Sequence, residues 1–133
     1  MSTVTLDGRS LTREGLVAIA RGARVDVAPA PWDAVQKAAD FIAEQVALQE
    51  PIYGVTTGFG SNANRLLGAH PVRADRDMGG LQLHEELQNN LIVTHAVCVG
   101  EPFAADVVRA MMAIRINTLL RGHSGIRVST LQA

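Results

Sequence analysis

Two histidines, one of them followed by glutamates, are the first residues whose types and spacing could do chemistry. His84-Glu85-Glu86 begins like the His-Glu-x-x-His zinc motif, but position 88 is glutamine, so the second histidine ligand is missing. His84 and His95 share one face of a helix, yet a separation of eleven residues places them about 16 Å apart, too far for one metal ion. The residues alone therefore exclude a zinc site and favour a structural role for each histidine.

The only tyrosine of the chain, Tyr53, opens a segment rich in glycine. Residues 53–60 read Tyr-Gly-Val-Thr-Thr-Gly-Phe-Gly, and glycines permit backbone conformations closed to other residues, so the segment could form a shaped lid over a site. The step Gly58-Phe59-Gly60 is too short for a dinucleotide-binding fingerprint and follows no clear strand. On pattern alone, a tyrosine packed where a helix meets a loop is the simpler interpretation.

Residues 1–28 are predicted to form a small element of strand and helix. Extended segments at 4–8 and 24–27 flank a short helix, which Thr12 can cap and Gly22 can end. We expect the two extended segments to pair in a hairpin-like arrangement.

Residues 29–52 are predicted to form an amphipathic helix that leads to the tyrosine. Pro31 suits the first helical position, and apolar side chains follow at spacings of three and four residues on one stripe: Trp32, Val35, Ala39, Ile42 and Val46. Residues 53–76 follow neither the helical nor the strand period and are predicted to form a long irregular loop. Loops of that length are usually functional or disordered.

Residues 77–133 are predicted to be helical in three pieces. The first runs from 77 to 98, and the third begins near 126 after a turn. The second, 103–120, has apolar side chains nearly all the way around, as in a helix buried inside a large assembly. A chain of 133 residues can hardly bury such a helix alone, so we expect an oligomer or a missing remainder of the protein.

These elements together predict a mainly α single domain, residues 1–133, with a small β element near the N-terminus. Lys and Arg number 12 against 13 Asp and Glu and are scattered, which excludes nucleic acid and anionic membrane as partners. There is no signal-peptide pattern and no run of 18 apolar residues, so we expect a cytoplasmic protein. The single cysteine, Cys98, lies in an apolar run and is predicted to be a buried thiol without chemistry.

The segment at 53–60 resembles the tyrosine-loop motif of the histidine, phenylalanine and tyrosine ammonia-lyase family. Blocks at 87–96, 99–102 and 116–127 are similar to consecutive blocks of that family in order and spacing, so the resemblance covers essentially the whole chain. It implies the helical N-terminal domain of the ammonia-lyase (fumarase/aspartase-like) superfamily, in a homotetramer whose active sites are shared between subunits.

By this resemblance Tyr53 is the base that removes the β-proton of an amino acid substrate. The family captures that substrate with an electrophilic 4-methylideneimidazole-5-one group, made autocatalytically from an internal Ala-Ser-Gly. A tyrosine side chain ordinarily has a pKa of about 10, so the surroundings of such a base must favour its phenolate. His95 matches the position that selects the substrate ring, and Gly60 and Leu91 match further substrate-binding positions. A histidine there argues for histidine as substrate first and tyrosine second, the latter because residues 63–66 also resemble tyrosine ammonia-lyases.

The chain also departs from the family pattern. It contains no Ala-Ser-Gly, and the stretch between Leu67 and Leu81 is longer than is usual in the family. We therefore expect the chain to carry no cofactor of its own and, by itself, not to turn over substrate. Two alternatives to a histidine ammonia-lyase segment stay open: part of a tyrosine ammonia-lyase or aminomutase, and a truncated, non-catalytic helical module that binds a partner or itself.

Overall fold

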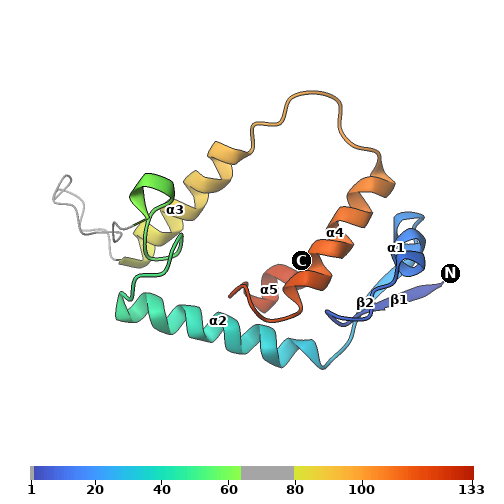
Figure 1. Ribbon diagram of the computed structural model, residues 1–133, viewed down its shortest axis with the longest axis horizontal. Helices are drawn as coiled ribbons and strands as arrows, with labels where there is room; N and C mark the ends of the chain where they lie inside the picture. Colours follow the sequence, from blue (N-terminus) through green and yellow to red (C-terminus); the bar gives the residue numbers. More distant parts are fainter. Residues whose placement is uncertain (1, 64–79) are drawn as a thin grey trace. The chain divides into compact units, whose positions relative to one another are not determined.

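The computed structural model of the chain describes residues 2–63 and 80–133 (Figure 1). Predictions that fall on 64–79, which include much of the long loop, lie outside the described residues. The described part is mainly helical with one small parallel sheet, which confirms the predicted fold class. It divides into two compact units, taken here one at a time: Met1–Ala43 with Glu101–Ala133, and Glu44–Gly100. That the chain is a single domain stays a prediction.

The first unit begins with a strand, a helix and a second strand. β1 (Thr3–Leu6) and β2 (Arg24–Val27) pair in parallel, with Thr3 opposite Arg24, and α1 (Arg13–Ala20) lies between them in the sequence. The predicted hairpin-like pairing is wrong. A hairpin joins antiparallel strands through a tight turn, whereas parallel strands need a longer crossover, which α1 provides here.

The local signals for α1 act as the sequence predicted. The N–H of Gly15 donates to Oγ1 of Thr12 at 3.1 Å, so Thr12 caps the helix. Glu14 lies in the first turn, near the positive end of the helix dipole. Gly22 follows the helix with φ 95°, the left-handed conformation in which many helices end.

α2 (Pro31–Leu48) begins at the predicted proline. Its apolar stripe is confirmed, because Val35 is buried and the remaining members are half-buried: Trp32, Ala39, Ile42 and Val46. The spacing of three and four residues therefore marks the covered face of this helix.

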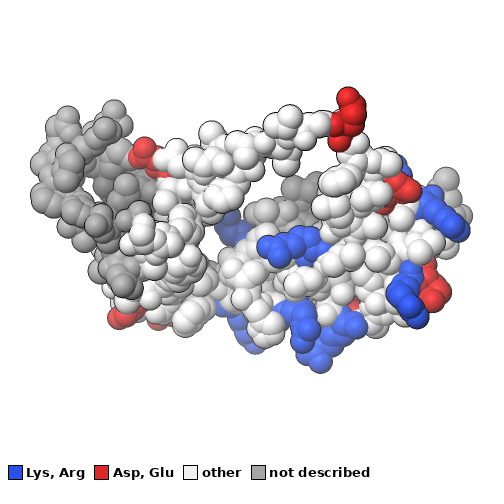
Figure 2. Space-filling model, turned by 45° about the horizontal axis from the view of Figure 1, so that its top comes forward, with Lys and Arg blue, Asp and Glu red and all other residues white. Residues whose placement is uncertain are grey.

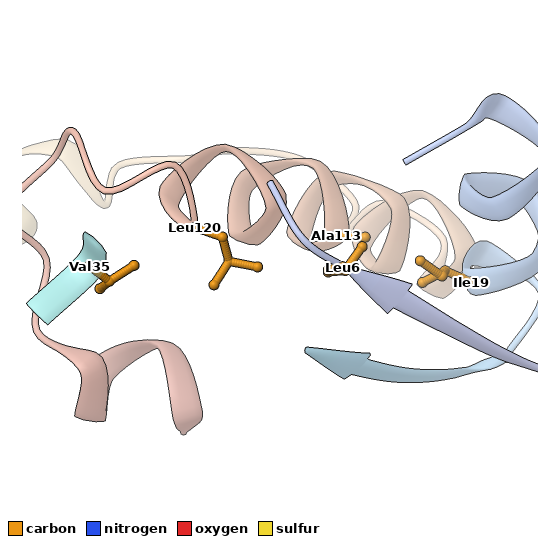
Figure 3. Close-up of a cluster of buried hydrophobic side chains, with 5 residues drawn as sticks. All are labelled: Leu6, Ile19, Val35, Ala113 and Leu120. Atoms are coloured by element: carbon orange, nitrogen blue, oxygen red, sulfur yellow. The ribbon is translucent and has the colours of Figure 1, made fainter. Parts of the chain in front are cut away.

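A small apolar core holds the first unit together, as Figure 3 shows, and its buried side chains are Leu6, Ile19, Val35, Ala113 and Leu120. α4 (Ala105–Leu119) contributes to this core and packs against α1 and β1. Between α4 and α5 (Val128–Gln132) the chain turns at Gly122, where φ is 70° and an added Cβ would come within 2.7 Å of the Ala34 carbonyl group. This turn therefore lies directly on α2, at a distance that only glycine permits.

Much of the apolar surface of α4 has no cover among the described residues. Five of its large apolar side chains are exposed: Val107, Val108, Met111, Met112 and Ile114. The helix is apolar nearly all round, as predicted, and the packed side is the one that meets α1 and β1.

The second unit contains η1 (Gly60–Asn62) and α3 (Gly80–His95). Residues 96–100, which follow α3, have no regular structure, and Cys98 is exposed there. The prediction of a buried thiol is wrong, because Val97 and Val99 beside it are exposed as well. An apolar run in the sequence implies burial only when a neighbouring element covers it.

All Lys and Arg side chains of the described residues belong to the first unit. On the face drawn in Figure 2, the Lys and Arg side chains of the described residues form separate groups, some with Asp or Glu beside them. Within residues 2–63 and 80–133, no helix is both long and apolar enough to cross a membrane.

Candidate active site

The chain turns sharply after α2, and the carbonyl group of Ile52 is the centre of that turn. It accepts hydrogen bonds from the backbone N–H groups of Val55, Thr56 and Thr57 at 3.0, 3.0 and 3.2 Å. Just before the turn, Gln49 has φ 58°, a left-handed conformation that ends α2. The tyrosine segment is therefore coiled tightly from its first residues.

Two buried hydroxyl groups hold this turn from inside. Thr56 and Thr57 are only 2% and 3% exposed. Oγ1 of Thr56 donates to the carbonyl group of Glu50 and accepts from the N–H of Ile52 at 2.7 Å. Oγ1 of Thr57 lies 3.3 Å from the carbonyl oxygen of Ile52 and 3.2 Å from that of Gly58. Both hydroxyl groups thus find backbone partners in place of water.

Tyr53 lies on the outside of the turn. Its side chain is 64% exposed, and its hydroxyl oxygen accepts a hydrogen bond from the N–H of Gly60 at 3.3 Å. Its ring meets Phe59 edge-on, with 6.2 Å between the ring centroids. Gly54 has φ 71°, and a Cβ there would come within 2.7 Å of the Phe59 ring, so this position requires glycine. The segment 53–60 therefore closes on itself and presents a phenol at its surface.

α3 carries the second group of predicted site residues. Nδ1 of His95 lies 2.8 Å from the carbonyl oxygen of Leu91. A carbonyl oxygen only accepts, so Nδ1 carries the proton in this contact, and Nε2 of the neutral ring is left as an acceptor. His95 is exposed and Leu91 is half-buried. The imidazole can therefore receive an N–H or O–H group from a ligand.

A hydrogen bond between described residues joins the tyrosine segment to α3. Nε2 of Gln88 donates to the carbonyl group of Gly54 at 3.5 Å, the long end of the hydrogen-bond range. Gln88, Leu91 and His95 are spaced by three and four residues, so they share one face of the helix. The face that carries His95 is thus the face that meets the tyrosine segment.

The four predicted site residues form two local hydrogen-bonded pairs, Tyr53 with Gly60 in the tyrosine segment and Leu91 with His95 in α3. Their roles stay predictions. Sequence reasoning missed Thr56 and Gln88. A signal existed for Thr56, because threonine hydroxyls in irregular segments commonly bond to nearby backbone groups. For Gln88 the signal was its spacing from His95, two helical turns along the same face.

Metal binding has no support from the described side chains. Within residues 2–63 and 80–133, no group of three or more His, Cys, Asp or Glu could hold a metal ion. The side chain of His84 lies outside those described.

Comparison with known proteins identifies the family. Residues 11–133 match the family described as "Aromatic amino acid lyase". The chain belongs to the aromatic amino acid lyase family. It is 43% identical over 126 residues to the histidine ammonia-lyase of Symbiobacterium thermophilum, and 41% identical over 130 residues to that of Gloeobacter violaceus. These matches take in 94% and 97% of this chain but 22% and 23% of the relatives, so the chain spans less than a quarter of their length.

Solved structures of two enzymes share the fold of this aromatic amino acid lyase chain. Histidine ammonia-lyase from Trypanosoma cruzi matches with a TM-score of 0.76 and 36% identity, over 98% of this chain and 23% of that one. Tyrosine aminomutase from Streptomyces globisporus matches with a TM-score of 0.80 and 34% identity, over the same shares, 98% and 23%. The resemblance that begins with the segment 53–60 is thereby confirmed at the level of family and fold.

Proposed function

We propose that this chain supplies the base-bearing tyrosine segment and a ring contact to the active site of an ammonia-lyase that converts histidine to urocanate. The observation that carries the proposal is the exposed Tyr53, whose hydroxyl group is held by the N–H of Gly60 in a closed segment. His95 supports histidine as the substrate. So do the relatives, which are histidine ammonia-lyases at 40–43% identity.

In this proposal the oxygen of Tyr53, as phenolate, takes the β-proton of the substrate. The C–H electron pair becomes the Cα=Cβ double bond, and ammonia leaves with the electron pair of the C–N bond. Nε2 of His95 accepts a hydrogen bond from the substrate imidazole N–H, which favours this substrate over one with a plain phenyl ring. Gly60 and Leu91 contact the bound amino acid.

The family's 4-methylideneimidazole-5-one group would supply an electrophile for the substrate amino group. The residues of this chain do not fit the role of its source, because the 133 residues contain no Ala-Ser-Gly. No step that we assign to this chain passes through that group. The assigned residues bind the substrate, orient it and remove its proton.

Tyr53→Phe in the full gene product tests the proposal. General bases contribute about 10²–10⁴-fold to a rate, so the formation of urocanate, followed by its absorbance, should fall by at least about 100-fold. Phe41→Leu, at another exposed aromatic residue, is the control and should leave the rate unchanged. An unaltered rate in Tyr53→Phe would rule out Tyr53 as the base.

An enzyme that acts on tyrosine, as a lyase or an aminomutase, is the second candidate. The fold match to a tyrosine aminomutase at 34% identity favours it, and a phenol O–H can donate to Nε2 of His95 as an imidazole N–H can. Product analysis separates the candidates. Urocanate from histidine supports the first, whereas an unsaturated acid or a β-amino isomer from tyrosine supports the second.

The proposal also covers location and partners. It places the enzyme in the cytoplasm as a homo-oligomer with a small-molecule substrate and without nucleic acid or membrane partners. The exposed apolar side chains of α4 support association with further protein surface.

A further inference from the structure

We propose that Thr56 is a positioning residue, whose hydroxyl group fixes the backbone from which Tyr53 projects. The catalytic consequence rests on the proposed function, in which Tyr53 is the base. The structural part rests on the contacts of the Thr56 side chain alone. The two parts can therefore be tested separately.

The hydroxyl of Thr56 bridges the two backbone groups on either side of Pro51. It donates to the carbonyl group of Glu50 and accepts from the N–H of Ile52 at 2.7 Å. Proline has no N–H and a fixed φ, so the bridge closes a short loop whose remaining freedom is small. The exit of the chain from α2 is thereby held in one conformation.

Ile52, which immediately precedes Tyr53, is fixed on both of its backbone groups. Its N–H donates to Thr56, and its carbonyl oxygen accepts from three backbone N–H groups of the same turn, with the Thr57 hydroxyl a fourth and longer contact at 3.3 Å. The peptide unit that enters Tyr53 therefore has little room to rotate. The direction of the tyrosine side chain depends on that unit, and hence on the Thr56 hydroxyl.

Burial makes this hydroxyl hard to replace. Thr56 is 2% exposed, so water cannot readily take over its two hydrogen bonds if the oxygen is removed. On the exposed side of the segment, the Tyr53 hydroxyl meets the N–H of Gly60, its ring meets Phe59 edge-on, and Gln88 donates to the carbonyl group of Gly54 at the long distance of 3.5 Å. Loss of the buried bridge should therefore let Tyr53 move.

Thr57 offers a matched control beside it. It is equally buried, yet its hydroxyl lies 3.3 and 3.2 Å from two carbonyl oxygens and bridges no N–H group. The change Thr57→Val removes the same atom as Thr56→Val from the same turn. It should disturb the tyrosine less, because the N–H of Ile52 keeps its partner and the carbonyl group of Ile52 keeps its three backbone N–H donors when the longer contact of the Thr57 hydroxyl is lost.

The first experiment uses the single tyrosine of the chain as a reporter. Replacement of tyrosine by 3-fluorotyrosine labels Tyr53 alone in the 133-residue chain and should give one ¹⁹F resonance. We expect Thr56→Val to move this resonance toward that of free fluorotyrosine, and Thr56→Ser and Thr57→Val to leave it close to wild type. A resonance unchanged in Thr56→Val overturns the proposal, whether or not the chain is part of an ammonia-lyase.

The second experiment measures kinetics in the full gene product. Misplacement of a catalytic group by about 1 Å can cost about 100-fold, so kcat should fall about 10- to 100-fold in Thr56→Val, with KM changed less than about twofold. Thr56→Ser should restore kcat, because serine keeps the hydroxyl. If Thr56→Ser folds but has the low kcat expected for Thr56→Val, the methyl group matters instead of the hydroxyl group, and the proposal fails. This result overturns the proposal even if Thr56→Val does not fold. If Tyr53→Phe is fully active, the proposed function fails while the ¹⁹F result stands.

Discussion

His95 is the residue that carries the proposed choice of substrate. The carbonyl group of Leu91 holds Nδ1 at 2.8 Å, and Nδ1 as the donor makes Nε2 the acceptor of the ring. An acceptor in that place suits an imidazole N–H or a phenol O–H and offers nothing to a plain phenyl ring.

We predict that His95→Leu lowers kcat/KM for histidine by about 10- to 100-fold, because the substrate imidazole loses a hydrogen-bond partner worth about 1–3 kcal/mol. The rate with phenylalanine should rise relative to that with histidine. His123→Leu, at an exposed histidine in the first unit, is the matched control and should change neither. An unaltered ratio of the two substrates in His95→Leu would remove His95 from the ring-binding role.

Asp7 is a second residue with a distinct electrostatic environment. Its carboxylate accepts hydrogen bonds from the backbone N–H and the hydroxyl of Ser10 and from the N–H of Arg9, all at 2.7 Å. The backbone bond from Ser10, and then its hydroxyl, lower the pKa of Asp7 from 3.8 to about 2. The carboxylate form is thus favoured in the folded chain.

The lowered pKa of Asp7 predicts a contribution to stability that is complete above about pH 4 and is lost as the pH falls toward about 2. Asp7→Asn should therefore flatten the pH dependence of the melting temperature between about pH 4 and 2. Glu101→Gln, at an exposed acid far along the chain, should leave that slope unchanged. A slope in Asp7→Asn equal to that of wild type would show that these bonds persist in the unfolded chain or do not form.

At the scale of elements, the sequence predicted correctly those features that depend on residues close together in the chain. The cap at Thr12 and the apolar stripe of α2 concern residues within a few turns of one another, and both predictions are confirmed. The pairing of β1 with β2 was predicted wrongly, because short alternating segments show that strands exist but not in which direction they run. Pairing depends on where the chain between the strands passes, and here it passes through a helix.

The candidate site shows the same limit. The motif at 53–60 pointed to Tyr53, and a threonine in an irregular segment suggests a bond to a nearby backbone group, but the pattern did not identify Glu50, across a proline, as the partner of Thr56. The prediction that Cys98 is buried was wrong for a related reason. Its apolar neighbours indicated burial, but no described element covers them. Contacts between segments depend on how the segments pack, and the spacing of apolar residues in the sequence does not give this information.

Substitutions at two glycines with left-handed backbones can distinguish the cost of backbone strain from the cost of a steric clash. Gly22, after α1, has φ 95° and open space where a Cβ would stand, whereas a Cβ on Gly122 would lie 2.7 Å from the Ala34 backbone. We predict that Gly22→Ala costs about 1–2 kcal/mol through its backbone alone. Gly122→Ala should cost about 1–3 kcal/mol more, because α2 must shift to admit the methyl group. Urea unfolding followed by circular dichroism measures both, and equal losses would mean that the turn does not pack on α2.

At the scale of the whole molecule, the main feature is the apolar surface of α4, which the described residues leave exposed. A globular protein rarely leaves a contiguous set of large apolar side chains in water, since each buried Val, Ile or Met side chain stabilises by about 1.5–3 kcal/mol. Within the described residues α4 packs mainly on α1 and β1, and Met111, Met112 and Ile114 remain exposed. We therefore expect this helix to be covered by further protein surface.

We therefore predict that the 133-residue chain, produced alone, associates with itself through α4. Sedimentation velocity over a range of concentrations should show species larger than the monomer. The double change Met111→Gln with Met112→Gln should shift them toward monomer, because glutamine keeps the helix but removes the apolar surface. Thr118→Gln, at an exposed polar position of the same helix, should leave the distribution as in wild type. A chain that stays monomeric at every concentration would mean that this surface is tolerated in water, and the argument for a covering partner would fail.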